Sequence, residues 1–587
     1  MSKSILLNGD ALTRKDVINV AVSNYQVEVD ISKLSASLNY INEKVKNEKI
    51  VYGVTTGFGS NTNKMIQKED AIDLQLNLLR SHACGVGKPL SREIVRAIMV
   101  IRLNTLLKGY SGVQESTVNQ LAFLINNQIH PVIPEKGSVG ASGDLCPLSH
   151  MALPLLGEGE IEYKGTTYRT EDFMESEDAK AIGYRPITLG YKEGLALNNG
   201  TTVIAAVATI ALAKADNLIK VATLSTALIY ESLCARDSAF RFDPVHQIRK
   251  HSGQIEIAQW LKTLLEGSKL VGITQKEIIE LLLQNAKIPA DVRLQLEQLN
   301  TNVEHDEQVQ ISNKLIFKLR SEGYDDLAYI LQFARLKWKP QDSYSIRCVP
   351  QVFGASKVAI DHASDIIENE LNAACDNPLI FADEDRVVSG GNFHGQPVAL
   401  VMDYLKLAVA EIGNITERQL NKMVDRNTND GLPPFLIDGT GLNSGLMVTQ
   451  YAAASIVSEN KVLVHPASAD SVPTCENTED HVSMGTIAAR QAIEIAENVE
   501  DIVVFAIMAG YYAIHLRMRQ FEKVNLESSL EGMLAPSMVE LCKTIRNSNK
   551  AYQKEDFFET DRFIAPETRA VKSSWSEFVE LAERYLG

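Results

Sequence analysis

Residues 140–144 read GASGD, a run of small residues with one serine at its centre. If the backbone bends tightly there, the amide nitrogen of Gly143 can reach the carbonyl carbon of Ala141 and close a five-membered ring. Loss of two water molecules, one of which takes the Ser142 hydroxyl, leaves a methylidene group conjugated to that ring. The product is a strong electrophile made without an external cofactor. Three such residues alone are far more often a plain Gly/Ser turn, so other motifs must decide.

Eight segments of the chain, including the tripeptide's own surroundings, resemble the motifs of the aromatic amino-acid ammonia-lyases. They occur in the order of that family, and the resemblance covers about residues 5–520 apart from one insertion. The segments are 52–59 (YGVTTGFG), 137–150 (GSVGASGDLCPLSH), 194–201 (GLALNNGT), 341–351 (QDSYSIRCVPQ), 376–379 (DNPL), 389–394 (SGGNFH), 465–474 (HPASADSVPT) and 479–484 (EDHVSM).

The resemblance implies a 4-methylidene-imidazol-5-one (MIO) cofactor formed from Ala141, Ser142 and Gly143, with no metal and no external cofactor. The reaction has to remove a weakly acidic β-proton and expel an amine, which is a poor leaving group. An electrophile that captures the substrate makes that departure easier. The sequence does not decide whether the substrate amine or its aromatic ring attacks the electrophile.

The resemblance also assigns roles to single residues. It makes Tyr52 the base for the β-proton, and since a phenol has an ordinary pKa of about 10, its surroundings have to favour the phenolate. It makes Arg347 the residue that holds the substrate carboxylate, for which a guanidinium offers a planar, bidentate fork. Asn199 and Tyr344 match residues that hydrogen-bond the carboxylate or the ring oxygen of the cofactor.

Other matched positions concern the choice of substrate. Gln341 and Phe393 match active-site positions of the family. Ser81 and His82 resemble the selectivity pair of histidine ammonia-lyases, where polar side chains can hydrogen-bond an imidazole. Glu479 also follows the histidine enzymes, because a carboxylate suits a basic imidazole better than a phenol.

The resemblance therefore favours L-histidine as the substrate and trans-urocanate as the product. A tyrosine ammonia-lyase or a tyrosine 2,3-aminomutase of the same family remains the alternative. Three departures from the histidine enzymes keep it open: Asn198 in place of an apolar residue, Thr202 in place of Gln, and Cys475-Glu476 in place of a small pair.

Two other enzyme classes fit the sequence less well. A Ser/His hydrolase would place its serine in a GxSxG turn between a strand and a helix, and Ser142 has no such surroundings. A metal enzyme is disfavoured because the eleven histidines show no HExxH or similar spacing.

The elements that position these residues follow from periodicity and composition. Glycine-rich loops are expected at 52–59 and 137–144, since closely spaced glycines do not hold a helix. Long helices are predicted from apolar residues at three- and four-residue spacing. These predicted helices cover residues 201–234, 352–374, 400–424 and 485–519.

We therefore expect an all-α fold in which a long central helical bundle follows an N-terminal domain of mixed helices and loops that carries the cofactor. The expected domains are 1–200, 201–520 and 521–587, with a charged helical surface insertion at about 257–339. The family resemblance further implies a homotetramer whose active sites are shared between subunits, so that Tyr52, Ser142 and Arg347 need not come from one chain.

Bulk composition limits the partners. The chain of 587 residues has a formal net charge of -16, which disfavours binding to nucleic acid or to an anionic membrane. Seven scattered cysteines without CxxC spacing read as reduced thiols. No signal peptide is apparent, and charges at Lys214, Asp216 and Lys220 interrupt the most apolar stretch. We expect a cytoplasmic enzyme that acts on a small aromatic amino acid and binds no membrane.

Overall fold

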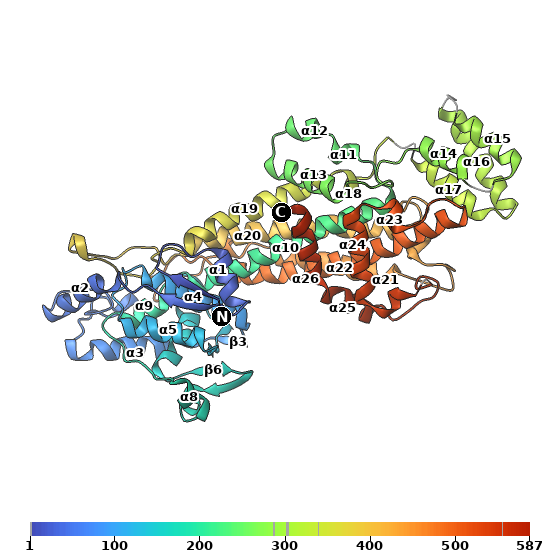
Figure 1. Ribbon diagram of the computed structural model, residues 1–587. Coiled ribbons are helices and arrows are strands. Elements are labelled where there is room, and N and C mark those ends of the chain that lie inside the picture. The colour runs from blue at the N-terminus through green and yellow to red at the C-terminus, as the bar shows by residue number, and fades with distance from the viewer. Residues whose placement is uncertain (1–2, 286–287, 301–304, 338–339, 555) are drawn as a thin grey trace. The chain divides into compact units, whose positions relative to one another are not determined.

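The computed structural model describes residues 3–285, 288–300, 305–337, 340–554 and 556–587. The fold is mainly helical with a few short pairs of strands (Figure 1), which confirms the expected all-α class. Two compact units can be separated. The first comprises residues 1–214, 360–407 and 464–494, and the second comprises residues 215–359, 408–463 and 495–587. The domain boundaries expected from the sequence stay a prediction.

Four long helices contribute residues to both units, and all four were predicted to within a few residues. They are α10 (Thr202–Leu233), α19 (Val349–Glu370), α20 (Gln396–Val424) and α22 (Gly485–Lys523). By length and composition, α10 and α22 could cross a membrane. However, 72% and 78% of their most apolar windows are buried inside the protein. Such burial is typical of a core helix that is apolar on all sides.

The first unit combines short helices with strand pairs. Its helices are α1 (Arg14–Ala21), α2 (Leu34–Lys46), α3 (Ala71–His82), α4 (Arg92–Leu107), α5 (Glu115–Asn126), α6 (Leu145–Ala152), α7 (Thr170–Met174), α8 (Glu177–Ile182) and α9 (Glu193–Asn198). Its strands are β1 (Ser4–Leu7), β2 (Gln26–Val29), β3 (Val86–Pro89), β4 (His130–Pro131), β5 (Pro134–Lys136), β6 (Glu160–Tyr163), β7 (Thr166–Arg169), β8 (Leu379–Phe381) and β9 (Arg386–Val388). The pair β1/β2 is parallel, whereas β3/β5, β4/β6/β7 and β8/β9 are antiparallel.

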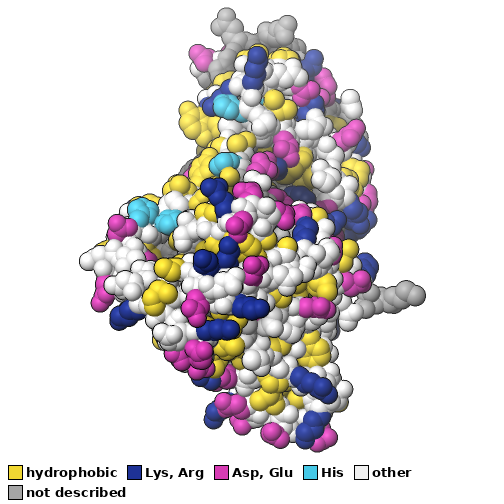
Figure 2. Space-filling view, turned by 90° about the vertical axis from the view of Figure 1, so that its left-hand side faces the viewer, with side chains coloured by type: hydrophobic (Ala, Val, Ile, Leu, Met, Phe, Trp, Pro, Cys, Tyr) yellow, Lys and Arg dark blue, Asp and Glu magenta, His cyan; other side chains and the backbone are white. Residues whose placement is uncertain are grey.

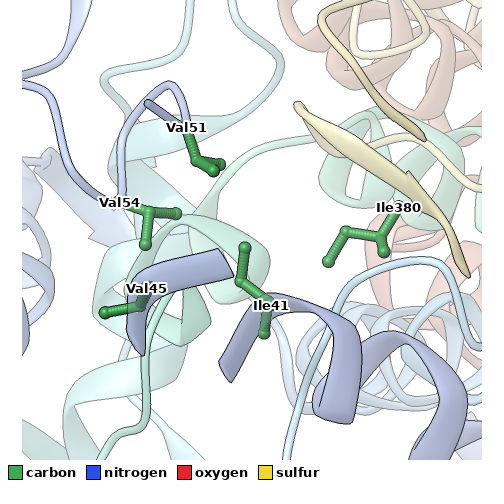
Figure 3. Packing of buried hydrophobic residues seen from close by; sticks show 5 residues of the cluster. All are labelled: Ile41, Val45, Val51, Val54 and Ile380. Atoms are coloured by element: carbon green, nitrogen blue, oxygen red, sulfur yellow. The ribbon is translucent and has the colours of Figure 1, made fainter. Parts of the chain in front are cut away.

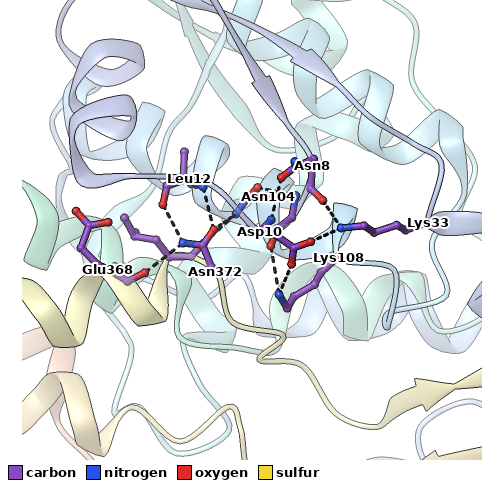
Figure 4. A network of polar contacts seen from close by, with 10 residues as sticks. Asn8, Asp10, Leu12, Lys33, Asn104, Lys108, Glu368 and Asn372 are labelled. Carbon is purple, nitrogen blue, oxygen red and sulfur yellow. Dashed lines mark hydrogen bonds and ion pairs between the residues drawn. The ribbon is translucent and has the colours of Figure 1, made fainter.

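A polar network fastens the N-terminal segment of the first unit (Figure 4). The side chain of Asn372 donates to the carbonyl of Leu12 and accepts from its amide, both at 2.9 Å. Asn104 donates to the Asn372 side chain at 3.2 Å. Lys108 donates to the carboxylate of Asp10 at 2.7 Å, and this hydrogen bond is the main cause of the lowered pKa of Asp10. Segments far apart in the sequence are thus joined around α4.

The second unit is built almost entirely of helices. They are α11 (Ser238–Arg241), α12 (Asp243–Gln247), α13 (Ser252–Leu264), α14 (Gln275–Asn285), α15 (Ala290–Leu299), α16 (His305–Ser321), α17 (Asp325–Leu336), α18 (Tyr344–Arg347), α21 (Met447–Leu463), α23 (Leu530–Met533), α24 (Pro536–Ser548), α25 (Ile564–Ser573) and α26 (Trp575–Leu586). Helices α14 to α17 pack on one another and belong to the segment read from the sequence as an insertion. Residues 286–287, 301–304 and 338–339 of that segment lie outside the described residues.

Candidate active site

The tripeptide 141–143 lies in a bend directly before α6. Gly143 has a φ of +76°, in the left-handed region that favours glycine. A Cβ atom at Gly143 would lie 2.3 Å from the carbonyl oxygen of Gly200, which leaves no room for any side chain. The next residue, Asp144, donates its amide to the same Gly200 oxygen at 2.8 Å. The glycine of the tripeptide is therefore pressed against the chain that follows α9.

The buried carboxylate of Asp144 holds this bend in place. One oxygen accepts the backbone amide of Ile204 at 2.8 Å, in the first turn of α10. The other accepts the hydroxyls of Ser138 at 2.7 Å and Thr486 at 2.8 Å. Burial raises the pKa of Asp144, although these hydrogen bonds act against the rise. The bend is thereby connected to the starts of two long helices.

Asn199 follows α9 and faces the tripeptide. Its Nδ2 donates to the backbone oxygen of Ser142 at 2.6 Å. Its Oδ1 is buried and has no hydrogen-bond partner among the described residues. The neighbouring Asn198, one of the departures from the histidine enzymes, is also buried and donates to the Ser149 hydroxyl at 3.1 Å. Asn198 therefore joins α9 to α6, whereas Asn199 donates a hydrogen bond to the bend at 141–143.

The loop that carries Tyr52 rests on an apolar cluster (Figure 3). Val51 and Val54, on either side of Tyr52, pack with Ile41 and Val45 of α2 and with Ile380 of β8. This packing fixes the loop backbone around the tyrosine.

The phenol of Tyr52 accepts the backbone amide of Gly59 at 3.2 Å. Burial raises the pKa of Tyr52, the Gly59 amide lowers it, and nearby Glu479 and Cys475 raise it further. The groups that this chain places around the phenol therefore favour its protonated form, unlike the environment that a base would need. A positive charge close to the phenol, such as the substrate ammonium, would act against this rise.

Glu479 links the tripeptide to the loop before α22. Its Oε1 accepts the Ser142 hydroxyl at 2.5 Å, and its Oε2 accepts the Thr474 hydroxyl at 2.6 Å. The backbones of Thr474 and Glu479 also pair with each other, at 2.9 and 3.3 Å. This loop therefore holds the carboxylate directly against the serine that would lose its hydroxyl.

His82 is the last residue of α3. Its Nδ1 lies 2.9 Å from the Ser81 hydroxyl, so the two residues form a hydrogen-bonded pair. Burial lowers the pKa of His82, and neutral imidazole is therefore favoured at pH 7. Leu74 and Leu78 precede His82 at four-residue spacing and lie on the same face of the helix.

These side chains surround one cavity of about 820 Å³. Of the residues predicted for the site, the ones that line it are Tyr52, His82, Ala141, Ser142, Asn199, Phe393 and Glu479. Gly143 and Ser81 are next to lining residues. Residues that sequence reasoning missed also line the cavity, among them Lys64, Leu74, Leu78, Asn377, His394 and His481.

Parts of the sequence could have pointed to these missed residues. Leu74 and Leu78 repeat the four-residue spacing that ends at His82. His394 and His481 belong to two of the segments that resemble the family, although no role was assigned to them. Their facing ring nitrogens are 3.4 Å apart. Gly59 has a φ of +53°, in the left-handed region that favours glycine, and a Cβ atom there would lie 2.4 Å from the sulfur of Cys475, another departure.

Gln341, Tyr344 and Arg347 belong to the second unit, and their part in the site stays a prediction. The Arg347 guanidinium lies 4.6 Å from the centre of the Tyr344 ring, and its Nε donates to the Asp342 carbonyl at 3.1 Å. Within the described part of the chain no carboxylate pairs with Arg347. The terminal nitrogens of its guanidinium are thus available to an outside carboxylate.

The sequence of this chain matches one protein family over most of its length. The family model described as aromatic amino acid lyase matches residues 12–535. Histidine ammonia-lyase of Alkaliphilus oremlandii is 43% identical over 516 residues, which cover 87% of this chain and 88% of that protein. Histidine ammonia-lyase of Caldanaerobacter subterraneus is 42% identical over 88% of this chain and 89% of its own length.

Two solved structures are also similar to this chain over nearly its whole length. The crystal structure of histidine ammonia-lyase from Trypanosoma cruzi has a TM-score of 0.79 at 32% identity and covers 99% of this chain and 95% of its own. Tyrosine aminomutase from Streptomyces globisporus has a TM-score of 0.81 at 31% identity and covers 100% and 99%. The expected carbon–nitrogen lyase class is confirmed. The chain belongs to the aromatic amino acid lyase family.

Proposed function

We propose that this enzyme eliminates ammonia from L-histidine and releases trans-urocanate, using an MIO group formed from Ala141, Ser142 and Gly143. The observation that carries the proposal is the placement of Ser142 within hydrogen-bond distance of both Asn199 and Glu479, in a cavity that also holds Tyr52 and His82. The curated relatives named histidine ammonia-lyase support the choice of substrate.

The residues of the bend fit such a group. Ring closure needs a nitrogen without a bulky neighbour at position 143, where the space admits only glycine. The Ser142 backbone oxygen would become the ring oxygen, and the Asn199 amide already donates to it. The unpartnered Asn199 Oδ1 is a further acceptor beside the ring position. When present, the MIO group supplies an electrophilic carbon that captures the substrate.

The chain's own residues then divide the remaining work. Asn199 stabilises negative charge on the oxygen that it contacts, as a donor in an oxyanion hole does. Tyr52 takes the β-proton, and the positive charge of the substrate ammonium offsets the raised pKa of the phenol. Arg347 holds the substrate carboxylate with its fork of donors.

The preference for histidine comes from His82 and Glu479. A neutral His82 can accept a hydrogen bond from the substrate imidazole or donate one to it. Glu479 provides a carboxylate at the same cavity, which suits a ring that gains a proton. An apolar pair at 81 and 82 would leave the polar atoms of the imidazole without partners.

We also propose that the enzyme is a cytoplasmic homotetramer with shared active sites. Leu400, Tyr404 and Leu407 form an apolar stripe along α20, each with 46 to 56% of its surface exposed. Such a stripe is suited to burial against another subunit. A second subunit could bring Arg347 and Tyr344 to this cavity, where the Arg347 guanidinium would provide a fork of donors for the substrate carboxylate.

The surface charge agrees with a small-molecule substrate. On the face shown in Figure 2, basic and acidic side chains are interspersed and form no continuous basic field. With a net charge of -16, the chain is a poor ligand for nucleic acid or anionic lipid.

The alternative is a tyrosine ammonia-lyase or tyrosine 2,3-aminomutase. The tyrosine aminomutase structure supports it, since its TM-score of 0.81 is at least as high as that of the histidine enzyme. A mutase would use the same side chains and return the amine to the β-carbon.

The test is to offer the purified enzyme L-histidine, L-tyrosine and L-phenylalanine in parallel and to identify the products by mass spectrometry. We expect urocanate and ammonia from histidine as the dominant reaction. Formation of coumarate or β-tyrosine as the main product would replace the proposal by the alternative. His82→Leu serves as the matched variant and should lower turnover of histidine more than that of tyrosine.

A further inference from the structure

A second cavity, of about 520 Å³, lies within the second unit where the insertion meets the long helices. One wall comes from α16 and α17, through Arg320, Tyr329 and Gln332. Another part of the lining comes from the end of α22, through Arg519 and Lys523. The loop after α20 closes it and contributes Arg426. Its volume is in the range of ordinary small-molecule pockets.

The charges that line this cavity do not balance. Its four cationic side chains are Arg320, Arg426, Arg519 and Lys523, whereas Asp326 and Asp438 are its two acidic ones. Both carboxylates are already engaged, Asp326 by Lys523 at 3.1 Å and Asp438 by Arg519. Two guanidinium groups are left over in a chain whose overall charge is strongly negative.

Those two surplus groups are Arg320 and Arg426. Neither pairs with a carboxylate of the residues that the structure describes. Arg320 is held in position, because it donates to the Gln332 side chain at 2.7 Å and lies 5.5 Å from the centre of the Tyr329 ring. An arginine held in this way loses less conformational entropy when it binds an anion.

The loop beside the cavity is fixed as well. Gln520 donates to the carbonyl of Gly431 at 2.9 Å, and the buried Arg517 donates to the carbonyl of Asp430 at 2.8 Å. Both bonds connect the loop after α20 to α22. The backbone of the loop that follows Arg426 is therefore positioned before any ligand arrives, which favours specific over diffuse anion binding.

We propose that this cavity binds a small polyanion that carries at least two phosphate or carboxylate groups, with Arg320 and Arg426 as its main ligands. Guanidinium groups recognise both kinds of oxyanion through paired hydrogen bonds. The elimination reaction does not require the insertion. The proposed site would give the insertion a function, because α16 and α17 supply one wall of the pocket. The proposal does not depend on the substrate of the enzyme.

The test is isothermal titration calorimetry on the full-length enzyme with pyrophosphate, and separately with citrate, at fixed ionic strength. We expect saturable binding of at least one probe with one site per chain, and the tighter probe identifies the oxyanion class. Replacing both surplus arginines, as R320Q/R426Q, should weaken binding about a hundredfold, since each charge-assisted contact contributes about tenfold. Sulfate at the same ionic strength should compete only weakly, because it carries one anionic group instead of two.

Two control variants make the result decisive. Arg569→Gln removes an exposed guanidinium on α25 that does not line the pocket, and it should bind the probe like the wild type. Arg426→Lys keeps the charge but loses the fork, and it should fall between the wild type and the double variant. Absence of saturable binding by the wild type to either probe would overturn the proposal. So would equal affinities in the wild type and R320Q/R426Q.

Discussion

The two units of this enzyme use their polar side chains in different ways. In the first unit, Ser142, Asn199 and Glu479 lie on irregular backbone and contact one another across a cavity. In the second unit, Glu231 lies on α10, is buried, and is satisfied by the Ser268 hydroxyl at 2.6 Å and the Ala535 amide at 2.8 Å. Similar hydrogen bonds thus orient reactive groups in one unit and join helices in the other.

This difference implies that substitutions in the two units should separate activity from stability. Loop residues around the cavity ought to change the chemistry with little effect on unfolding. Buried polar residues of the long helices ought to do the opposite. Arg347 is an exception to this expectation, because it belongs to the second unit and has a proposed role in substrate binding.

The largest effect is expected for Ser142→Ala. Without the hydroxyl, no water can be lost from this residue and no conjugated methylidene can form. Activity should fall by at least about a thousandfold, together with the near-ultraviolet absorbance of the cofactor, while the melting temperature changes little. Parallel spectra and rate measurements check this, and turnover by the alanine variant at the wild-type rate would refute the role of Ser142.

Asn199→Ala should come next. The Asn199 amide donates to the Ser142 oxygen, and the loss of one such donor typically lowers kcat by about 10²- to 10³-fold. Steady-state kinetics provide the measurement. Asn198→Leu is the matched control, because it changes the adjacent buried amide that contacts Ser149, and it should keep kcat close to the wild-type value. Equal losses in both variants would mean that Asn199 acts only through packing.

Arg347→Ala should raise KM by about ten- to a hundredfold, with a smaller change in kcat, since paired charge-assisted hydrogen bonds to the carboxylate are lost. Arg347→Lys should recover part of the affinity because the charge remains without the fork. An unchanged KM in the alanine variant would show that Arg347 does not bind the substrate. The second unit would then have only a structural role.

Glu231→Gln should affect stability alone. Burial raises the pKa of Glu231 to about 7 from its ordinary value of 4.5. The folded protein therefore keeps a proton that the unfolded chain releases, and the free energy of unfolding falls as pH rises from 4.5 to 7. The free energy of unfolding falls by about 3 kcal/mol in total over this range. A glutamine at this position does not titrate, so the variant lacks this pH dependence.

Urea unfolding of both proteins at pH 5 and pH 8 measures this difference. We expect the variant to gain stability relative to the wild type at the higher pH, with kcat unchanged. Glu580→Gln, an exposed glutamate of α26, is the control and should leave the pH dependence as it is. If the stability of Glu231→Gln depended on pH as that of the wild type does, groups other than Glu231 would cause this dependence.

The sequence predicted much of this molecule, for reasons that are local. The four long helices follow from apolar spacing, and the two glycine-rich loops follow from composition. Tyr52, Ser142, Asn199 and Glu479 were found through motifs, and the structure brings all of them to one cavity.

Other features depend on contacts that no local pattern contains. The requirement for glycine at 143 comes from the close backbone of Gly200. The raised pKa of Tyr52 depends on its burial and on Glu479, which is far away in the sequence. The cavity-lining roles of His394 and His481 likewise appear only when the loops that carry them meet.

The central claim is that residues 141–143 cyclise and lose water, and peptide mass spectrometry of the active enzyme tests it most directly. We predict that the proteolytic fragment containing Ser142 is lighter than its sequence mass by two water molecules, and that the same fragment of Gly143→Ala has its full mass. An unmodified fragment from fully active wild-type enzyme would contradict the account.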